Sequence, residues 1–299
     1  MEWIADPMDA GGWLRERLDD DWSMHHFVPH GFEAYARIFH PAETYGEADA
    51  EGTTSSWAEA AAAFDTTLHT QASWQHLVRT PPDGDWRSRI APDGREFVCP
   101  DEGRMPVTQL AAIARHLAAH TTTPDAGCVG VWEGWGNIVG GFVDSSPGLP
   151  ADLGGDPIHA EVVWQSLHNR FNNPFHKPTW RPGILSDEIS KGARLELPDR
   201  NHVVFGSAPA AFADPDWILD APWRDREAEG HGFEPSAQHP SILWPADRAW
   251  VMVSEIDFDS TIVAGSNELI RAICADPSVE ALPIREGSSL HWDTDDINR

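Results

Sequence analysis

Residues 250–266, WVMVSEIDFDSTIVAGS, form the most informative stretch of this chain. The run from Trp250 to Ile256 is almost continuously apolar and is typical of a buried β-strand. Ser266 then precedes a helical pattern over 267–275, and its hydroxyl is suited to cap the first turn of a helix. The stretch therefore predicts a buried strand, a polar segment and a helix in succession.

The rest of the chain alternates short strand patterns with unevenly spaced helices. Helices are expected near 11–20, from the capping box Ser56–Glu59 into the alanine run 60–63, around Trp74–Val78 and over 107–120. Strands are expected at 28–41 and 279–284, as a pair at 128–133 and 137–143 around the turn 134–136, and as a hairpin at 195–197 and 202–205. Loops are expected at 43–54, 80–104 and 214–247. This pattern predicts an α+β fold, a mostly antiparallel sheet with helices packed on it. A single domain over 1–299 is expected, with a possible internal boundary near the 144–157 loop.

The composition is strongly acidic and rich in tryptophan. The net charge is −27, and the chain has 15 Trp but only 2 Tyr. A negative field of this size repels phosphate backbones and anionic lipid, so direct binding of nucleic acid or membranes is not expected. Cationic partners or bound metal ions are compatible with it, as is a role as a nucleic-acid mimic that blocks a DNA-binding protein.

Cysteine usage and the N-terminal sequence favour a cytoplasmic protein. Cys99, Cys128 and Cys274 are isolated and form no framework of pairs, as expected for reduced thiols. The start, MEWIADP, lacks the basic and apolar regions of a signal peptide, and no apolar run approaches the roughly 20 residues of a membrane helix.

Three alternating carboxylates, Glu255, Asp257 and Asp259, are the first candidate site. If the strand stays extended through 259, the three side chains share one face and would need a cation such as Mg²⁺ or Mn²⁺ between them. If the strand ends near Ile256, they lie in a solvated turn. Both alternatives remain open at the level of sequence.

The segment DFDST at 257–261 is similar to the nucleophile motif of haloacid-dehalogenase-type phosphatases, Asp-x-Asp-x-Thr after a hydrophobic strand. The resemblance implies that Asp257 attacks phosphorus, that Asp259 is the general acid and base, and that both help to hold Mg²⁺. In that family the motif opens the fold and a lysine follows it. Here 40 residues follow Asp259 and none is lysine, which puts the assignment in doubt.

Two further sets of residues are candidate ligand-binding groups. Trp132, Glu133 and Trp135 lie in a glycine-rich turn and could stack against a sugar or a cation, or pack over a sheet edge. Arg200 and Arg248 each follow an aspartate and could clamp an anionic ligand, or form internal salt bridges in this acidic chain.

Four blocks of the chain resemble an uncharacterised family of bacterial cytoplasmic proteins. They are PHGFEAYARIFHP at 29–41, VWEGWG at 131–136, LPDRNHVVFGS at 197–207 and LWPADRAWVMVSEIDFDSTIVAGS at 243–266. The resemblance spans most of the chain and implies no activity or ligand. Since no catalytic set is complete, the sequence favours a soluble, non-catalytic binding or interaction protein. The alternative is a divalent-metal-dependent, phosphatase-like hydrolase using Glu255, Asp257 and Asp259.

Overall fold

The computed structural model describes residues 1–21, 23–46, 51–143 and 179–299. The fold is α+β, as predicted, and all pairings between the described strands are antiparallel. A nine-stranded main sheet has the order β1-β11-β7-β12-β13-β14-β2-β15, with β10 paired to β11 outside this path. Its strands are β1 (Glu2–Trp3), β2 (Ala34–Phe39), β7 (Gly127–Trp132), β10 (Leu195–Leu197), β11 (Arg200–Gly206), β12 (Ile242–Pro245), β13 (Val251–Val253), β14 (Ser260–Gly265) and β15 (Ala281–Ile284).

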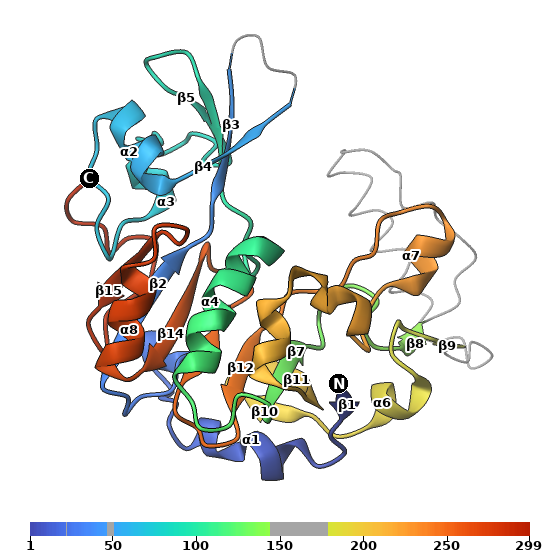
Figure 1. Ribbon diagram of the computed structural model, residues 1–299. Helices are drawn as coiled ribbons and strands as arrows, with labels where there is room; N and C mark the ends of the chain where they lie inside the picture. Colours follow the sequence, from blue (N-terminus) through green and yellow to red (C-terminus); the bar gives the residue numbers. More distant parts are fainter. Residues whose placement is uncertain (22, 47–50, 144–178) are drawn as a thin grey trace.

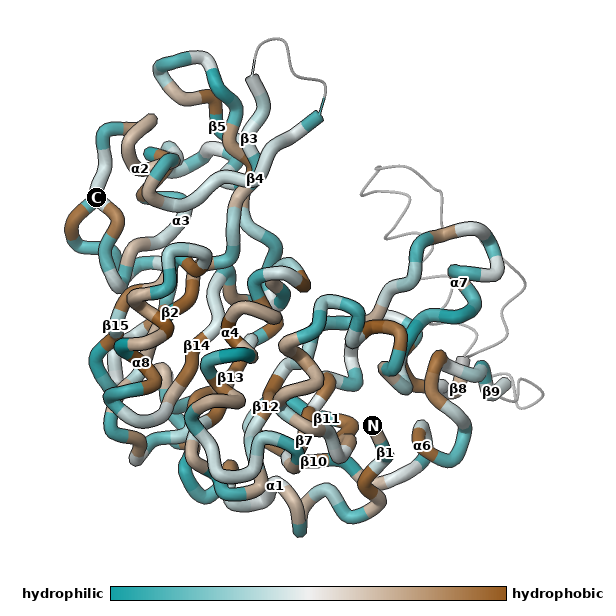
Figure 2. The backbone as a smooth tube through the Cα atoms, viewed as in Figure 1, coloured by the Kyte–Doolittle hydropathy of each residue, from teal (hydrophilic) through white to brown (hydrophobic). Residues whose placement is uncertain are grey.

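Apolar side chains cover both faces of the main sheet. Successive strand residues point to opposite faces, so Met252 and Val253 belong to different hydrophobic layers. Met252 lies in the layer with helices α4 (Val107–Ala119) and α8 (Asn267–Cys274). Val253 lies in the layer with α1 (Pro7–Arg15). Hydrophobic residues accordingly concentrate on the sheet and its covering helices, and hydrophilic ones on the loops (Figure 2).

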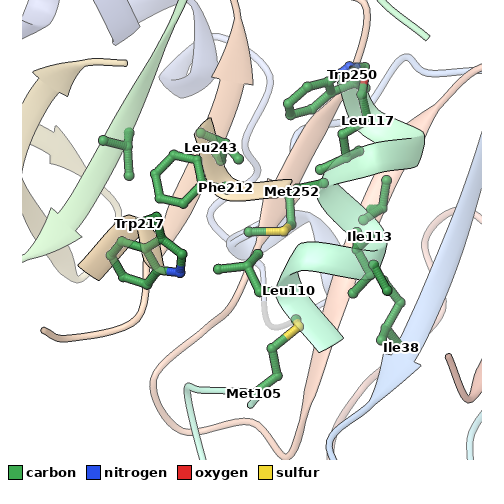
Figure 3. Packing of buried hydrophobic residues seen from close by; sticks show 14 of the residues in the cluster. Ile38, Met105, Leu110, Ile113, Leu117, Phe212, Trp217, Leu243, Trp250 and Met252 are labelled. Carbon is green, nitrogen blue, oxygen red and sulfur yellow. Dashed lines mark hydrogen bonds between the residues drawn. The ribbon is translucent and has the colours of Figure 1, made fainter. Parts of the chain in front are cut away.

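Helix α4 is predicted correctly, and its apolar stripe explains its position. Leu110, Ile113 and Leu117 recur at helical spacing and face the sheet (Figure 3). They meet Ile38, Trp250 and Met252 in one buried cluster. The Trp250 indole also donates a hydrogen bond of 2.9 Å to the Leu117 carbonyl, so its polar edge is satisfied inside the core.

A smaller sheet forms a separate layer, which we call the small lobe. It has the order β4-β3-β6-β5 and carries two helices. Its elements are β3 (Ala42–Tyr45), β4 (Thr53–Ser55), α2 (Trp57–Phe64), α3 (Trp74–Leu77), β5 (Ser88–Ile90) and β6 (Glu96–Val98). Trp57 and Phe97 are fully buried in its own core. The small lobe continues directly from β2, and the C-terminus of the chain lies beside it (Figure 1).

Buried polar contacts attach the small lobe to the main sheet. Arg37 of β2 donates hydrogen bonds of 3.1 and 2.8 Å to the carbonyls of Thr70 and Ala72. The Asp295 carboxylate is fully buried and accepts hydrogen bonds from the Ser73 backbone N–H and from the His69 ring. These contacts fix the lobe because each would leave a buried polar group unpaired if it broke.

The remaining elements are short. They are 3-10 helices η1 (Met24–His26), η2 (Pro209–Ala213) and η3 (Pro215–Asp220), helices α6 (Asp187–Lys191) and α7 (Arg226–Gly230), and strands β8 (Gly141–Val143) and β9 (Thr179–Arg181). The predicted pairing of 128–133 with 137–143 is wrong, because β8 pairs with β9 while β7 lies between β11 and β12. No helix among the described residues is long and apolar enough to cross a membrane.

Three predicted loops contain strands. The ranges 43–54 and 80–104 hold the strands of the small lobe, and 214–247 holds β12. All five strands are three or four residues long, and β3 and β4 expose polar residues, namely Glu43, Thr53 and Thr54. Their pairing partners rather than a local pattern therefore define them. The predicted 144–157 loop lies outside the described residues.

The predicted capping box at α2 is confirmed and has a measurable consequence. The Ser56 hydroxyl accepts the Glu59 N–H at 3.1 Å, and the Glu59 carboxylate accepts the Ser56 N–H at 2.9 Å. We expect Ser56→Ala to lower the free energy of unfolding by about 1 kcal/mol in urea denaturation. Ser236→Ala, at an exposed loop position, is the control and should stay within about 0.5 kcal/mol of the parent. Equal effects of the two substitutions would contradict the assigned cap.

Candidate functional site

The first result concerns the predicted row of carboxylates. Strand β13 ends at Val253, and the chain then turns, with the Phe258 N–H donating to the Glu255 carbonyl at 3.0 Å. The extended strand through 259 is therefore wrong, and the three side chains do not share a face. Glu255 is 6% exposed, whereas the side chain of Asp257 is 70% exposed. The two acids consequently experience very different environments.

Arg200 binds two of these carboxylates. Its Nε and Nη2 atoms donate to Glu255 Oε1 at 2.9 and 2.6 Å, and Nη2 also reaches Asp257 Oδ2 at 2.6 Å. Nη1 donates to the backbone carbonyl of Asp199 at 3.1 Å. Burial raises the pKa of Glu255, and the charge and hydrogen bonds of Arg200 oppose that rise. The guanidinium is therefore engaged on every side by internal acceptors.

The third carboxylate, Asp259, forms an ion pair with a different arginine, Arg37. Arg37 Nη2 donates to Asp259 at 3.1 Å, and Arg37 Nε donates to Ser260 at 2.8 Å. Among the described residues, no group of three or more His, Cys, Asp or Glu side chains is arranged to hold a metal ion. The predicted set Glu255, Asp257 and Asp259 is thus divided between two guanidinium groups. A cation between these carboxylates would have to displace both.

One tryptophan of the predicted stacking site at 132–135 contacts Arg200. The Arg200 guanidinium lies 5.7 Å from the ring centroids of both Trp132 and Phe27, a cation–π distance. Trp135 meets Trp132 edge to face at 5.7 Å and packs against the core. Glu133 accepts hydrogen bonds from Arg194 and Asn201 at 2.8 and 2.9 Å. The predicted stacking platform therefore already holds an internal cation.

Arg248 lies apart from these residues. It precedes β13, while Glu255 follows it, so the two lie at opposite ends of the strand. Its guanidinium is 5.2 Å from the Trp13 ring of α1, and its backbone adopts a left-handed φ of 56°. The structure therefore brings Trp132, Arg200, Glu255 and Asp257 together but not Arg248.

A small cavity adjoins Arg200. Its volume is about 20 Å³, which is room for about one water molecule. Its polar lining includes His26, Arg200, His202, Ser241 and Glu255. Burial, followed by the charge of Arg200, lowers the pKa of His202 to about 4, so this ring is neutral at pH 7. A cavity of this size admits no organic ligand, and its charged groups are paired internally.

A much larger cleft lies between the small lobe and α4. Its volume is about 420 Å³, within the range of small-molecule sites. Its lining comes from four separate parts of the chain: Phe39, Pro41, Thr54, Ser55, Ser56, Pro106, Thr108, Gln109, Ala112, Arg115, Pro277, Ser278 and Glu280. We call it the interlobe cleft. No residue predicted as a site from the sequence lines it.

Several polar groups of the interlobe cleft have no internal partner. Gln109 Nε2 donates to the Phe39 carbonyl at 3.0 Å, and the other end of the same amide, Oε1, is buried without a hydrogen bond. Within the described chain, the Thr54 and Thr108 hydroxyls and the Arg115 guanidinium have neither a hydrogen bond nor an ion pair. The Thr54, Thr108 and Arg115 groups are exposed and can bind a ligand without breaking an existing contact, whereas the Gln109 oxygen has almost no accessible surface.

Glu280, the other charged residue in the lining of the cleft, already has hydrogen-bond partners. The Glu280 carboxylate accepts the N–H groups of Trp57 and Ala58, at 2.6 and 2.9 Å, where α2 begins. Burial raises its pKa, and these two hydrogen bonds oppose the rise. The charge that the cleft offers to a ligand is therefore the positive charge of Arg115.

Sequence reasoning missed this cleft although it found α4. The apolar stripe of α4 was identified, but the polar positions Thr108, Gln109 and Arg115 were not considered as a lining. A polar stripe of this kind is normally the solvated side of an amphipathic helix. Only the small lobe opposite makes it the wall of a cavity. No protein-family model, curated protein or solved structure matches this chain.

Proposed function

We propose that this chain is a non-catalytic binding protein that holds a small polar ligand in the interlobe cleft. The observation that carries the proposal is the cleft itself, a cavity of about 420 Å³ whose exposed Thr54, Thr108 and Arg115 side chains have no partner within the described chain. A volume of this size is within the range of small-molecule sites, and these side chains can bind a polar ligand without breaking an existing contact.

The contrast with Arg200 supports the choice of the cleft. The charged groups Arg200, Glu255 and Asp257 are paired with one another, and the adjoining cavity is about 20 Å³. The cleft has the opposite properties: it has room, and it has free donors and acceptors. A hydrolase acting through Glu255, Asp257 and Asp259 would first have to separate these carboxylates from Arg200 and Arg37, at a cost of several kcal/mol.

A ligand screen with two matched tryptophan variants tests the proposal. Thr108 is exposed and lines the cleft, so Thr108→Trp fills the cleft without disturbing the core. Ala119 is exposed on the same helix and does not line the cleft, so Ala119→Trp is the control. We expect ligand-observed NMR with a library of neutral, anionic and cationic metabolite-sized compounds to detect binders of the parent and of Ala119→Trp. Thr108→Trp should lose them.

Two results would refute the binding proposal. One is a library without binders of the parent protein. The other is binding that persists equally in Thr108→Trp, which would place the ligand elsewhere. The fold of each variant is checked by its urea unfolding curve, so that loss of binding is not confused with loss of structure.

The setting of the protein belongs to the same proposal. We infer a cytoplasmic protein with reduced cysteines, a member of the uncharacterised bacterial family that its sequence blocks resemble. The net charge of −27 supports the absence of direct nucleic-acid or membrane binding. Against this negative field, the unpaired Arg115 in the cleft is a local positive charge.

A further inference from the structure

The free groups of the interlobe cleft differ in what they require of a ligand. The Arg115 guanidinium presents donors and a positive charge and is matched by a carboxylate or a phosphate. The Thr54 and Thr108 hydroxyls are exposed in the same cleft and can each donate and accept a hydrogen bond. A ligand that uses all three groups therefore combines an anionic group with hydroxyl or N–H groups.

The spacing of these groups sets the size of the ligand. Thr108 and Arg115 are seven residues apart on the same stripe of α4, which separates them by about 10 Å along the helix axis. Thr54 lies on β4 across the cleft. An ion of the size of phosphate or acetate cannot contact both ends. A chain of several hydroxylated carbons can.

We propose that the interlobe cleft binds a hydroxylated organic anion of the size of a sugar acid or a sugar phosphate. The anionic group binds Arg115, and ligand hydroxyls bind the hydroxyls of Thr54 and Thr108. The inference rests on the proposed function and adds the chemical class of the ligand. Glu280 does not oppose it directly, since its carboxylate is turned to the N–H groups of α2.

Isothermal titration calorimetry with five defined probes tests the ligand class. Gluconate and glucose 6-phosphate carry both the charge and the hydroxyls, glucose carries the hydroxyls alone, and acetate and inorganic phosphate carry the charge alone. We expect gluconate or glucose 6-phosphate to bind at least about tenfold more tightly than the other three probes. The comparison of the first two probes distinguishes a carboxylate from a phosphate.

Two variants assign the contacts. Arg115→Gln should weaken binding of the preferred acid by about tenfold or more and leave any glucose binding unchanged. Arg285→Gln, at an exposed arginine outside the cleft, is the control and should change neither affinity. Thr108→Val should weaken binding of acid and glucose alike, because it removes a hydroxyl of the cleft and not the charge.

The outcomes separate this inference from the proposed function. Glucose binding as tightly as gluconate, an unchanged affinity in Arg115→Gln, or no binding of any of the five probes would overturn the ligand class. The proposed function would still be judged by whether library binders are lost in Thr108→Trp and kept in Ala119→Trp.

Discussion

Replacing Arg200 with methionine is expected to lower the free energy of unfolding by about 3–5 kcal/mol, because the buried Glu255 loses its partner. Methionine retains much of the apolar stem that packs near Trp132 and Phe27 but supplies no charge. The loss should be largest near neutral pH. It should shrink as the pH falls, since protonation of Glu255 removes the unpaired charge. Urea denaturation at several pH values measures both effects.

Two companion variants identify the cause of that loss. Asp257→Asn removes the exposed partner of Arg200 and should cost less than about 1 kcal/mol. The double variant Arg200→Met with Glu255→Leu replaces the buried pair by apolar side chains and should recover most of the stability lost in Arg200→Met. A double variant as unstable as Arg200→Met would show that Arg200 acts through its packing and its other contacts, not through Glu255.

Acidification from pH 6.5 to 4 is expected to destabilise the protein through three buried histidines. Burial is the main cause that lowers the pKa of His40 and His202 to about 4 and that of His239 to about 3. An unfolded histidine has a pKa near 6.5, so in this range the unfolded chain binds up to three more protons than the folded chain. Their contribution is fully present above pH 6.5 and is lost as the pH falls toward the folded values.

The slope of the free energy of unfolding against pH measures this uptake. Each extra proton contributes about 1.4 kcal/mol per pH unit, so the three histidines together contribute up to about 4 kcal/mol per unit. His202→Phe should reduce the slope by about 1.4 kcal/mol per pH unit, which is the contribution of one proton. The raised pKa values of Glu102, Glu255 and Glu280 act in the opposite direction, because these acids protonate first in the folded state. The difference in slope between variant and parent measures the contribution of the His202 imidazole alone. An unchanged slope would mean that His202 is protonated in the folded protein.

The candidate site shows where inference from the sequence stops. Trp132, Arg200, Glu255 and Asp257 were each singled out by residue type, but their mutual contacts join parts of the chain separated by more than 50 residues. Whether Arg200 would meet an external anion or an internal acid depended on the turn after β13. The path of that turn is set by the neighbouring strands. The local sequence is compatible both with a strand extended through residue 259 and with a turn after the strand.

The sequence by itself determined the elements whose signal is local. The stripe of α4, the Ser56 capping box, the cap of α8 by Ser266 and the strand pair β10–β11 all follow from spacings of a few residues. Antiparallel α+β architecture followed from the order of these patterns. Local propensity and periodicity are sufficient here because the residues involved are neighbours in the chain.

Only the tertiary structure decided which segments of three or four residues form strands and which polar groups remain without a partner. It also decided that β7 pairs with β11 and β12, whereas β8 pairs with β9. The walls of the interlobe cleft come from 39–41, 54–56, 106–115 and 277–280, and no local pattern connects these segments. The physical reason is that pairing and satisfaction of polar groups depend on every neighbour in space. A side chain such as Arg115 is free, and one such as Arg200 engaged, because of residues distant in the chain.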